Sequence, residues 1–203
     1  LDPAVQTLRT ALNLAALNES ASERSVIIGR GLGLVGEWQL ARPAFEEAIR
    51  QDEENAEAWA WLGEASQQIG EEGVEQLEHA FQLNAGSSTV RGLRGLYYQR
   101  SGNFRQALTE FQTAAALEPD NAMWYVSLGE AHARLGDLIR ALEAYQKATT
   151  LAPEDPSYWR LLASFCAQNN VNIKDIGVPA AQIVQIDPIA SGRVYVQGKR
   201  LTL

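Results

Sequence analysis

Apolar residues recur along most of the chain at intervals of three and four residues, which is the spacing of one face of an α-helix. Tyr125, Leu128, His132 and Leu135 follow this spacing, and a second run in register begins after Gly136. The second run consists of Leu138, Ala141, Leu142, Tyr145 and Ala148. The pattern predicts two amphipathic helices joined by a tight turn at Gly136.

The same pair of helices recurs with a period close to 34 residues. Gly29, Gly63, Gly95 and Gly129 are 34, 32 and 34 residues apart, and each is followed seven residues later by a second glycine. The second glycines are Gly36, Gly70, Gly102 and Gly136. Such a period predicts an array of stacked units, because one unit alone cannot bury its apolar faces.

The two glycine positions have different physical roles. The second glycine ends a helix, where a left-handed backbone costs little without a side chain. The first lies inside a helix, where glycine costs about 1 kcal/mol relative to alanine. We therefore expect the first glycine to let the partner helix approach closely.

These positions resemble the tetratricopeptide repeat family, whose pattern is W-x2-L-G-x2-Y, then A-x3-F, then P, over 34 residues. The matching residues are Trp59, Leu62, Gly63, Ala107, Phe111 and Pro119, with Ser66 in place of the Tyr. The resemblance implies an all-α fold, a right-handed superhelical solenoid of antiparallel helix pairs with about five repeats plus partial ends.

The register divides the chain into full repeats and atypical ends. Residues 1–21 are interpreted as a helix that ends a preceding repeat or caps the array. Four repeats fill 22–155, as 22–55, 56–87, 88–121 and 122–155. A degenerate fifth repeat is expected at 156–190, with its second helix beginning near Pro179. For 191–203 we favour a truncated first helix of a sixth repeat over a hairpin. The chain lacks an initial Met, and we expect a piece of a longer array or a processed chain.

Composition and charge exclude several classes of function. A formal net charge of −8 argues against nucleic-acid binding, which needs cations to neutralise phosphates. The single cysteine, Cys166, rules out an internal disulfide, and two histidines leave little for metal chemistry. No apolar run reaches membrane-spanning length. We expect a soluble chain, cytoplasmic rather than exported, without a cofactor.

One glycine motif resembles a dinucleotide-binding site, but the repeat pattern argues against that interpretation. Gly31, Gly33 and Gly36 match G-x-G-x-x-G, which binds dinucleotides only in the order strand, glycine turn, helix. Gly36 already belongs to the repeat register, so a helix is expected here. His132 and Cys166 occupy packing positions, and no nucleophile–base pair can be named. The chain is therefore predicted not to be an enzyme.

The resemblance implies a scaffold that binds a protein or peptide. In this family the first helix of each repeat lines a concave groove. Carried onto this chain, the candidate groove residues are Val26, Arg30, Leu34, Ala60, Glu64, Gln68, Leu96, Arg100, Val126, Glu130, Arg134, Arg160 and Ser164. Arginines beside apolar residues suit an amphipathic helix or an extended peptide. One subtype of the family binds the C-terminal carboxylate of chaperones with paired Lys, Asn and Arg residues. At the matching positions of this chain only Arg30 is basic, which disfavours that subtype.

Three alternatives remain open. Exposed array ends favour self-association, or structural coupling within a larger multidomain protein. A catalytic domain outside these 203 residues is a second alternative. RNA binding by a related helical repeat is a third, which the acidic charge disfavours.

The third repeat departs from the pattern inside its first helix. Arg94 stands where Leu62 and Leu128 stand in other repeats. Gly92 and Gly95 together cost about 2 kcal/mol of helix propensity. These residues predict that the segment 86–96 bends or frays locally, and we call this segment the weak joint.

Overall fold

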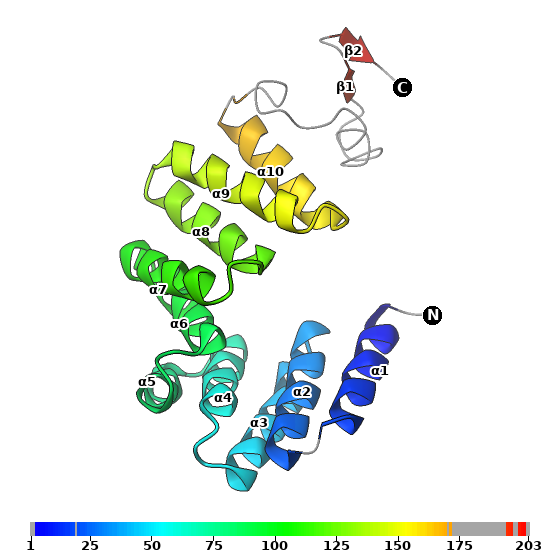
Figure 1. Cartoon of the computed structure of the whole chain (residues 1–203), viewed down its shortest axis with the longest axis vertical. Coiled ribbons are helices and arrows are strands. Elements are labelled where there is room, and N and C mark those ends of the chain that lie inside the picture. The colour runs from blue at the N-terminus through cyan, green and yellow to red at the C-terminus, as the bar shows by residue number, and fades with distance from the viewer. Residues whose placement is uncertain (1–2, 19, 170, 172–193, 197–198, 202–203) are drawn as a thin grey trace. The chain divides into compact units, whose positions relative to one another are not determined.

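The computed structural model describes residues 3–18, 20–169, 171, 194–196 and 199–201 (Figure 1). The helices in this part are α1 (Pro3–Ala16), α2 (Ala21–Leu34), α3 (Trp38–Gln51), α4 (Ala56–Gln68), α5 (Val74–Leu83), α6 (Ser88–Arg100), α7 (Phe104–Leu117), α8 (Ala122–Arg134), α9 (Leu138–Leu151) and α10 (Pro156–Gln168). Two short strands, β1 (Val194–Val196) and β2 (Lys199–Leu201), pair antiparallel, with Tyr195 opposite Arg200.

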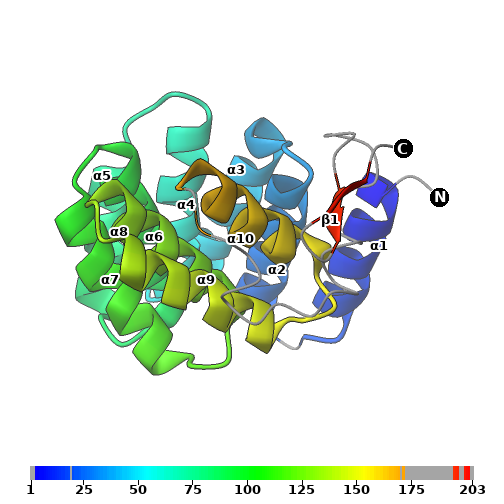
Figure 2. The same cartoon turned by 90° about the horizontal axis from the view of Figure 1, so that it is seen from above.

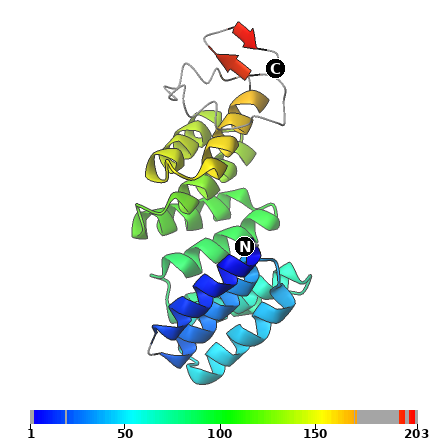
Figure 3. The same cartoon turned by 90° about the vertical axis from the view of Figure 1, so that its right-hand side faces the viewer.

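The chain divides into two compact units, Leu1–Leu117 and Glu118–Leu203. In the first unit, α1 packs on α2, and the pairs α2–α3, α4–α5 and α6–α7 follow. The first helices of these pairs also contact one another, α2 with α4 and α4 with α6. In the second unit, α9 packs against both α8 and α10. Figures 2 and 3 show the helix pairs from two further sides.

Polar side chains fix where the first helices begin. Ser20, Asn55, Ser87, Asn121 and Asp155 are the N-caps of α2, α4, α6, α8 and α10, and each side chain accepts a hydrogen bond from a backbone N–H in the first turn. Such a cap satisfies a helix donor that has no partner within the helix and contributes about 1 kcal/mol. Sequence and local structure agree at these five helix starts.

The turn within each helix pair requires glycine. Gly36, Gly70, Gly102 and Gly136 have φ between 74° and 84°, a left-handed conformation that side chains disfavour. The sequence expectation for these four positions is confirmed.

The interior glycines bring helices into close contact, as expected. A Cβ on Gly95 would lie 2.4 Å from the Phe111 ring, and one on Gly129 would lie 2.6 Å from the Tyr145 ring. Both aromatic rings come from the second helix of the same pair, and both are buried. A core aromatic residue of the partner helix therefore occupies the space that a side chain at the glycine would fill.

The C-terminal expectation for 191–203 is wrong for the residues that the structure describes. β1 and β2 pair there as antiparallel strands instead of forming a helix. Val194 and Val196 are β-branched and flank Tyr195, and such residues favour extended backbone over helix. The helix expected to begin near Pro179 lies outside the described residues. The repeat boundaries themselves stay a prediction.

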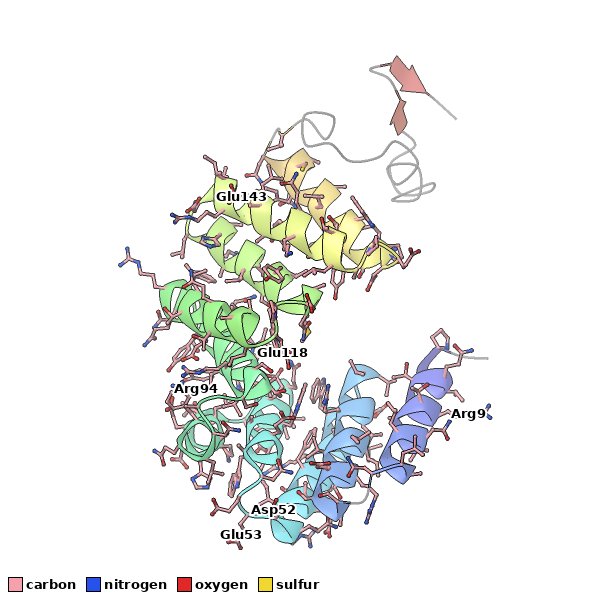
Figure 4. The ribbon with its side chains drawn as sticks, in the orientation of Figure 1. Arg9, Asp52, Glu53, Arg94, Glu118 and Glu143 are labelled. Carbon is pink, nitrogen blue, oxygen red and sulfur yellow. The ribbon has the colours of Figure 1, made fainter. Side chains whose placement is uncertain are left out.

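A buried ion network holds α6 between α5 and α7. Arg94, labelled in Figure 4, is 7% exposed. Its guanidinium donates to Glu110 of α7 at 2.8 Å and to Glu78 of α5 at 2.9 Å, and its central carbon lies 3.8 Å from the centre of the Phe81 ring. Arg91 also pairs with Glu110, at 3.0 Å. Ion pairs of Arg94 therefore take the place of the leucine that stands at Leu62 and Leu128, while the weak joint at 86–96 stays a prediction.

Candidate protein-interaction surface

The glycine motif, Cys166 and His132, which were considered above as possible cofactor-binding or catalytic residues, lie within helices of the repeat array. The G-x-G-x-x-G motif begins inside α2, so the strand that a dinucleotide site needs is not there. Cys166 is fully buried, which raises the pKa of its thiol. His132 is buried too, and desolvation lowers the pKa of its imidazole.

The described part of the chain holds no candidate metal site and no candidate membrane span. No three His, Cys, Asp or Glu side chains gather there in a way that would hold a metal ion. Nor does a described helix combine the length and the apolar character needed to cross a bilayer.

Some of the predicted groove residues belong to the core. Val26 and Ala60 are buried, and Leu96 packs against the cluster around Leu77 and Val90. Val126 is half-buried and packs against a corresponding cluster in the second unit. These four side chains contribute to the packing between helices.

Glu64 and Arg100 form a polar pair between neighbouring first helices. Arg100 of α6 donates to both carboxylate oxygens of Glu64 of α4, at 3.1 Å and 2.5 Å, and also to Gln67. Gln68 donates to the same carboxylate at 2.8 Å. The Glu64 side chain is 4% exposed, so its charge is neutralised inside the protein. Arg100 is thus already paired.

An open cavity of about 500 Å³ lies between α1 and α2. Its lining is mainly apolar and includes Ala11 and Leu14 of α1 with Ile27, Arg30 and Leu34 of α2. We call it the leucine pocket, because Leu14 and Leu34 are 54% and 80% exposed. The Arg30 guanidinium lies 5.3 Å from the centre of the Trp61 ring, a cation–π contact that orients it.

A second cavity of about 510 Å³ adjoins the first and shares Ile27 and Arg30 with it. Four carboxylates line it, from Glu23 of α2, from Asp52 and Glu54 of the α3–α4 turn, and from Glu57 of α4. We call it the carboxylate pocket. Arg30 is its sole basic lining residue, so the lining carries a net charge of −3. Asp52 is labelled in Figure 4, at the turn after α3.

The second unit has its own cavity, of about 510 Å³, which we call the C-terminal pocket. Glu130 and Arg134 of α8, Ser164 of α10 and Tyr145 of α9 line it. The remaining predicted residue, Arg160, is exposed on α10. Six of the predicted groove residues thus line cavities, namely Val26, Arg30, Leu34, Glu130, Arg134 and Ser164.

Sequence analysis missed the residues that complete the two pockets of the first unit. Glu23 and Ile27 share a stripe of α2 with Arg30 and Leu34, at steps of four, three and four residues. That spacing was available in the sequence as a signal. The carboxylate of Asp52 reaches the same cavity because the end of α3 packs on the start of α2, and that of Glu57 reaches it because α4 packs beside α2.

The fold defines an all-α repeat protein of stacked antiparallel helix pairs. The family model described as tetratricopeptide repeat matches residues 29–71 and 93–156, more than half of the chain. The chain belongs to the tetratricopeptide repeat family. Repeats of this kind serve as protein-interaction scaffolds, because stacking creates extended surfaces.

Individual relatives agree with this assignment. Superkiller complex protein 3 of Homo sapiens is 32% identical over 130 residues, which make up 60% of this chain and 8% of that protein. This chain thus spans less than a tenth of that relative's length. The thermophilic TPR protein TTC0263 of Thermus thermophilus aligns with a TM-score of 0.67 and 22% identity, covering 81% of this chain and 99% of that one. YrrB, described as a TPR protein with an unusual peptide-binding site, aligns at 0.54 and 16% identity, over 88% and 90% of the two chains. These two likenesses concern the fold alone.

Proposed function

We propose that the chain is a non-enzymatic scaffold that binds a peptide or helical segment of another protein on the first helices of its repeats. The observation that carries this proposal is the placement of six predicted groove residues around open cavities of about 500 Å³. Concave, partly apolar sites with a few polar groups are where proteins bind ligands. The peptide-binding site named for YrrB supports the same function by analogy of fold.

The arginines of the predicted groove do not contribute equally to this proposal. Arg30 lines two cavities and Arg134 lines one, whereas Arg100 neutralises the buried Glu64. Arg100→Glu would therefore place two carboxylates together and damage the fold. Variants that test binding belong at Leu34 and Arg134.

The test is affinity capture with the full chain, comparing surface variants with matched controls. Leu34→Glu changes an exposed leucine of a first helix, and Leu40→Glu changes one, 60% exposed, on the second helix α3. Arg134→Glu is matched by Arg105→Glu, at an exposed position of the second helix α7. We expect at least one protein to be retained by the parent and by both controls, and to be lost with Leu34→Glu or Arg134→Glu. Equal loss in the controls would reject binding on the first helices, and so would retention by every variant.

Self-association is the second candidate function, and α1 favours it. Leu12 and Leu17 are 56% and 82% exposed at this end of the described chain. Pairing two such surfaces would remove these leucines from water, worth roughly 25 cal/mol per Å². Sedimentation equilibrium of the parent and of a Leu12→Glu, Leu17→Glu variant tests it. A parent that stays monomeric at 100 µM, roughly the range of weak association, would exclude it.

A further inference from the structure

We propose that the leucine pocket and the carboxylate pocket form one site for a protein segment that carries basic residues at one end and leucine-sized apolar residues at the other. This inference rests on the proposed function, since it names the chemistry of the partner. The site lies wholly within the first unit, on α1, α2, the α3–α4 turn and α4.

One stripe of α2 joins the two pockets and gives the site its direction. Glu23, Ile27, Arg30 and Leu34 follow one another on the same side of the helix. Glu23 lines the carboxylate pocket, Leu34 lines the leucine pocket, and the two residues between them line both. The surface therefore changes from acidic to apolar along a single helix.

The leucine pocket is an apolar groove between two helices, and its leucines contact water over much of their surface. Leu34 is 80% exposed at the end of α2, and Leu14 of α1 is 54% exposed. Covering such side chains is favourable because apolar surface leaves water. No carboxylate lines this pocket, and its one charged lining residue is Arg30. An apolar side chain of the partner is thus favoured here.

The carboxylate pocket decides which charge the partner carries. Glu23 accepts a hydrogen bond from Asn18, Glu57 accepts one from Ser87, and Asp52 accepts one from the backbone N–H of Glu54. These donors are neutral, and within the described residues no ion pair neutralises Glu23, Asp52, Glu54 or Glu57. Glu64, by contrast, is paired with Arg100. The complementary ligand is a lysine or arginine side chain.

The dimensions set the length of the segment. From Glu23 to Leu34 the helix rises by eleven residues, about 16 Å at 1.5 Å per residue. An extended chain covers that length with about five residues, and a helix covers it with about eleven. A peptide of twelve residues therefore reaches both pockets in either conformation.

The experiment selects twelve-residue peptides from a random display library on the purified full chain. The affinities of the recovered peptides are then measured by fluorescence anisotropy with the parent and with variants. Leu34→Glu tests the leucine pocket, with Leu40→Glu as its control. A triple variant, Asp52→Asn with Glu54→Gln and Glu57→Gln, tests the carboxylate pocket. Its control makes the same chemical changes outside the pocket, at Asp120→Asn, Glu72→Gln and Glu143→Gln.

We expect the recovered peptides to share one or two basic residues followed or preceded by apolar residues. Leu34→Glu should weaken their binding by about 10- to 100-fold, as for the loss of one buried leucine contact. The triple variant should weaken it by about tenfold, and by less at high salt, because ions screen exposed charges. Both controls should bind within about twofold of the parent.

Two outcomes overturn the inference and leave the proposed function standing. In one, the peptides are acidic or indifferent to the Leu34 and triple variants, and binding is lost with Arg134→Glu. In the other, recovered peptides require only one of the two pockets. If no peptide is recovered and the chain captures no protein, the inference and the proposed function fail together. A parent that dimerises through Leu34 would make a second copy the occupant and also overturn the inference.

Discussion

Replacing Arg94 by leucine tests how the third repeat is held together. Arg94 binds two carboxylates from two different helices, and Glu110 is as buried as Arg94 itself, each side chain being 9% exposed. Removing one partner of a buried pair costs about 3–5 kcal/mol, because a buried charge loses its compensation. Glu110 keeps Arg91 at 3.0 Å, and Glu78 is half-exposed and returns to water. We therefore expect Arg94→Leu to lower the free energy of unfolding by about 3 kcal/mol.

The double variant Arg94→Leu, Glu110→Leu separates charge from packing. Arg94 and Glu110 are then both absent, and Arg91, which loses Glu110, is partly exposed and keeps its hydrogen bond to the backbone oxygen of Ala85. Apolar replacement of a buried pair is often neutral or stabilising. In addition, the Nε atom of Arg94 is buried without a hydrogen-bond partner among the described residues, a cost that leucine removes. The double variant should recover to within about 1 kcal/mol of the parent.

Urea unfolding followed by circular dichroism measures these differences. Because repeat arrays can lose cooperativity between units, hydrogen exchange of α6 and α7 amides should accompany it as a local readout. Arg105→Leu, at an exposed position of α7, is the control for the change of residue type and should stay close to the parent. A loss below about 1 kcal/mol for Arg94→Leu would refute the reasoning. A double variant as unstable as the single one would show that packing around Phe81, not charge, explains the loss.

Three further predictions concern other parts of the chain. Gly129→Ala should lower the melting temperature and cost about 2 kcal/mol, because its Cβ would lie 2.6 Å from the Tyr145 ring; an unchanged melting curve would contradict the close approach. Burial lowers the pKa of His132 below 6.5, so the folded state binds fewer protons and stability should fall as pH drops below about 6.5. Urea unfolding at pH 7 and pH 5 should show this fall in the free energy of unfolding of the parent, and a smaller fall in His132→Phe. An equal fall in both proteins would show that His132 does not cause it. Finally, the weak joint predicts faster amide exchange in 86–96 than in 122–150, and equal protection would reject it.

Much of the fold could be derived from the sequence because the repeat signals are local. The left-handed turns at Gly36 and Gly136 depend on the conformational freedom of glycine alone. Helix starts depend on short polar caps such as Asn55 and Asn121. At the C-terminal residues the repeat period was a misleading signal. It favoured a helix over 191–203, whereas the β-branched residues of β1 favour the strand that the structure has.

The candidate site was less accessible to sequence reasoning, since its charges come from separate segments. Glu23 and Glu57 are 34 positions apart, and they line one pocket only because α4 packs beside α2. Likewise, no local pattern pairs Arg100 with Glu64, which lie 36 residues apart. The prediction that Arg100 binds a ligand therefore did not take its ion pair with Glu64 into account.

By itself, the sequence determined the class of the protein: helix pairs with glycine turns, stacked in the manner of tetratricopeptide repeats. These features depend on residue type and on spacing within about 34 positions. Only the tertiary structure decided which charged side chains are already paired and which still face water. Arg94 and Arg100 are paired across helices, whereas Glu57 and its neighbours in the carboxylate pocket are not neutralised within the described chain. The physical reason is that ion pairing depends on distances between helices, and packing, not local residue pattern, sets those distances.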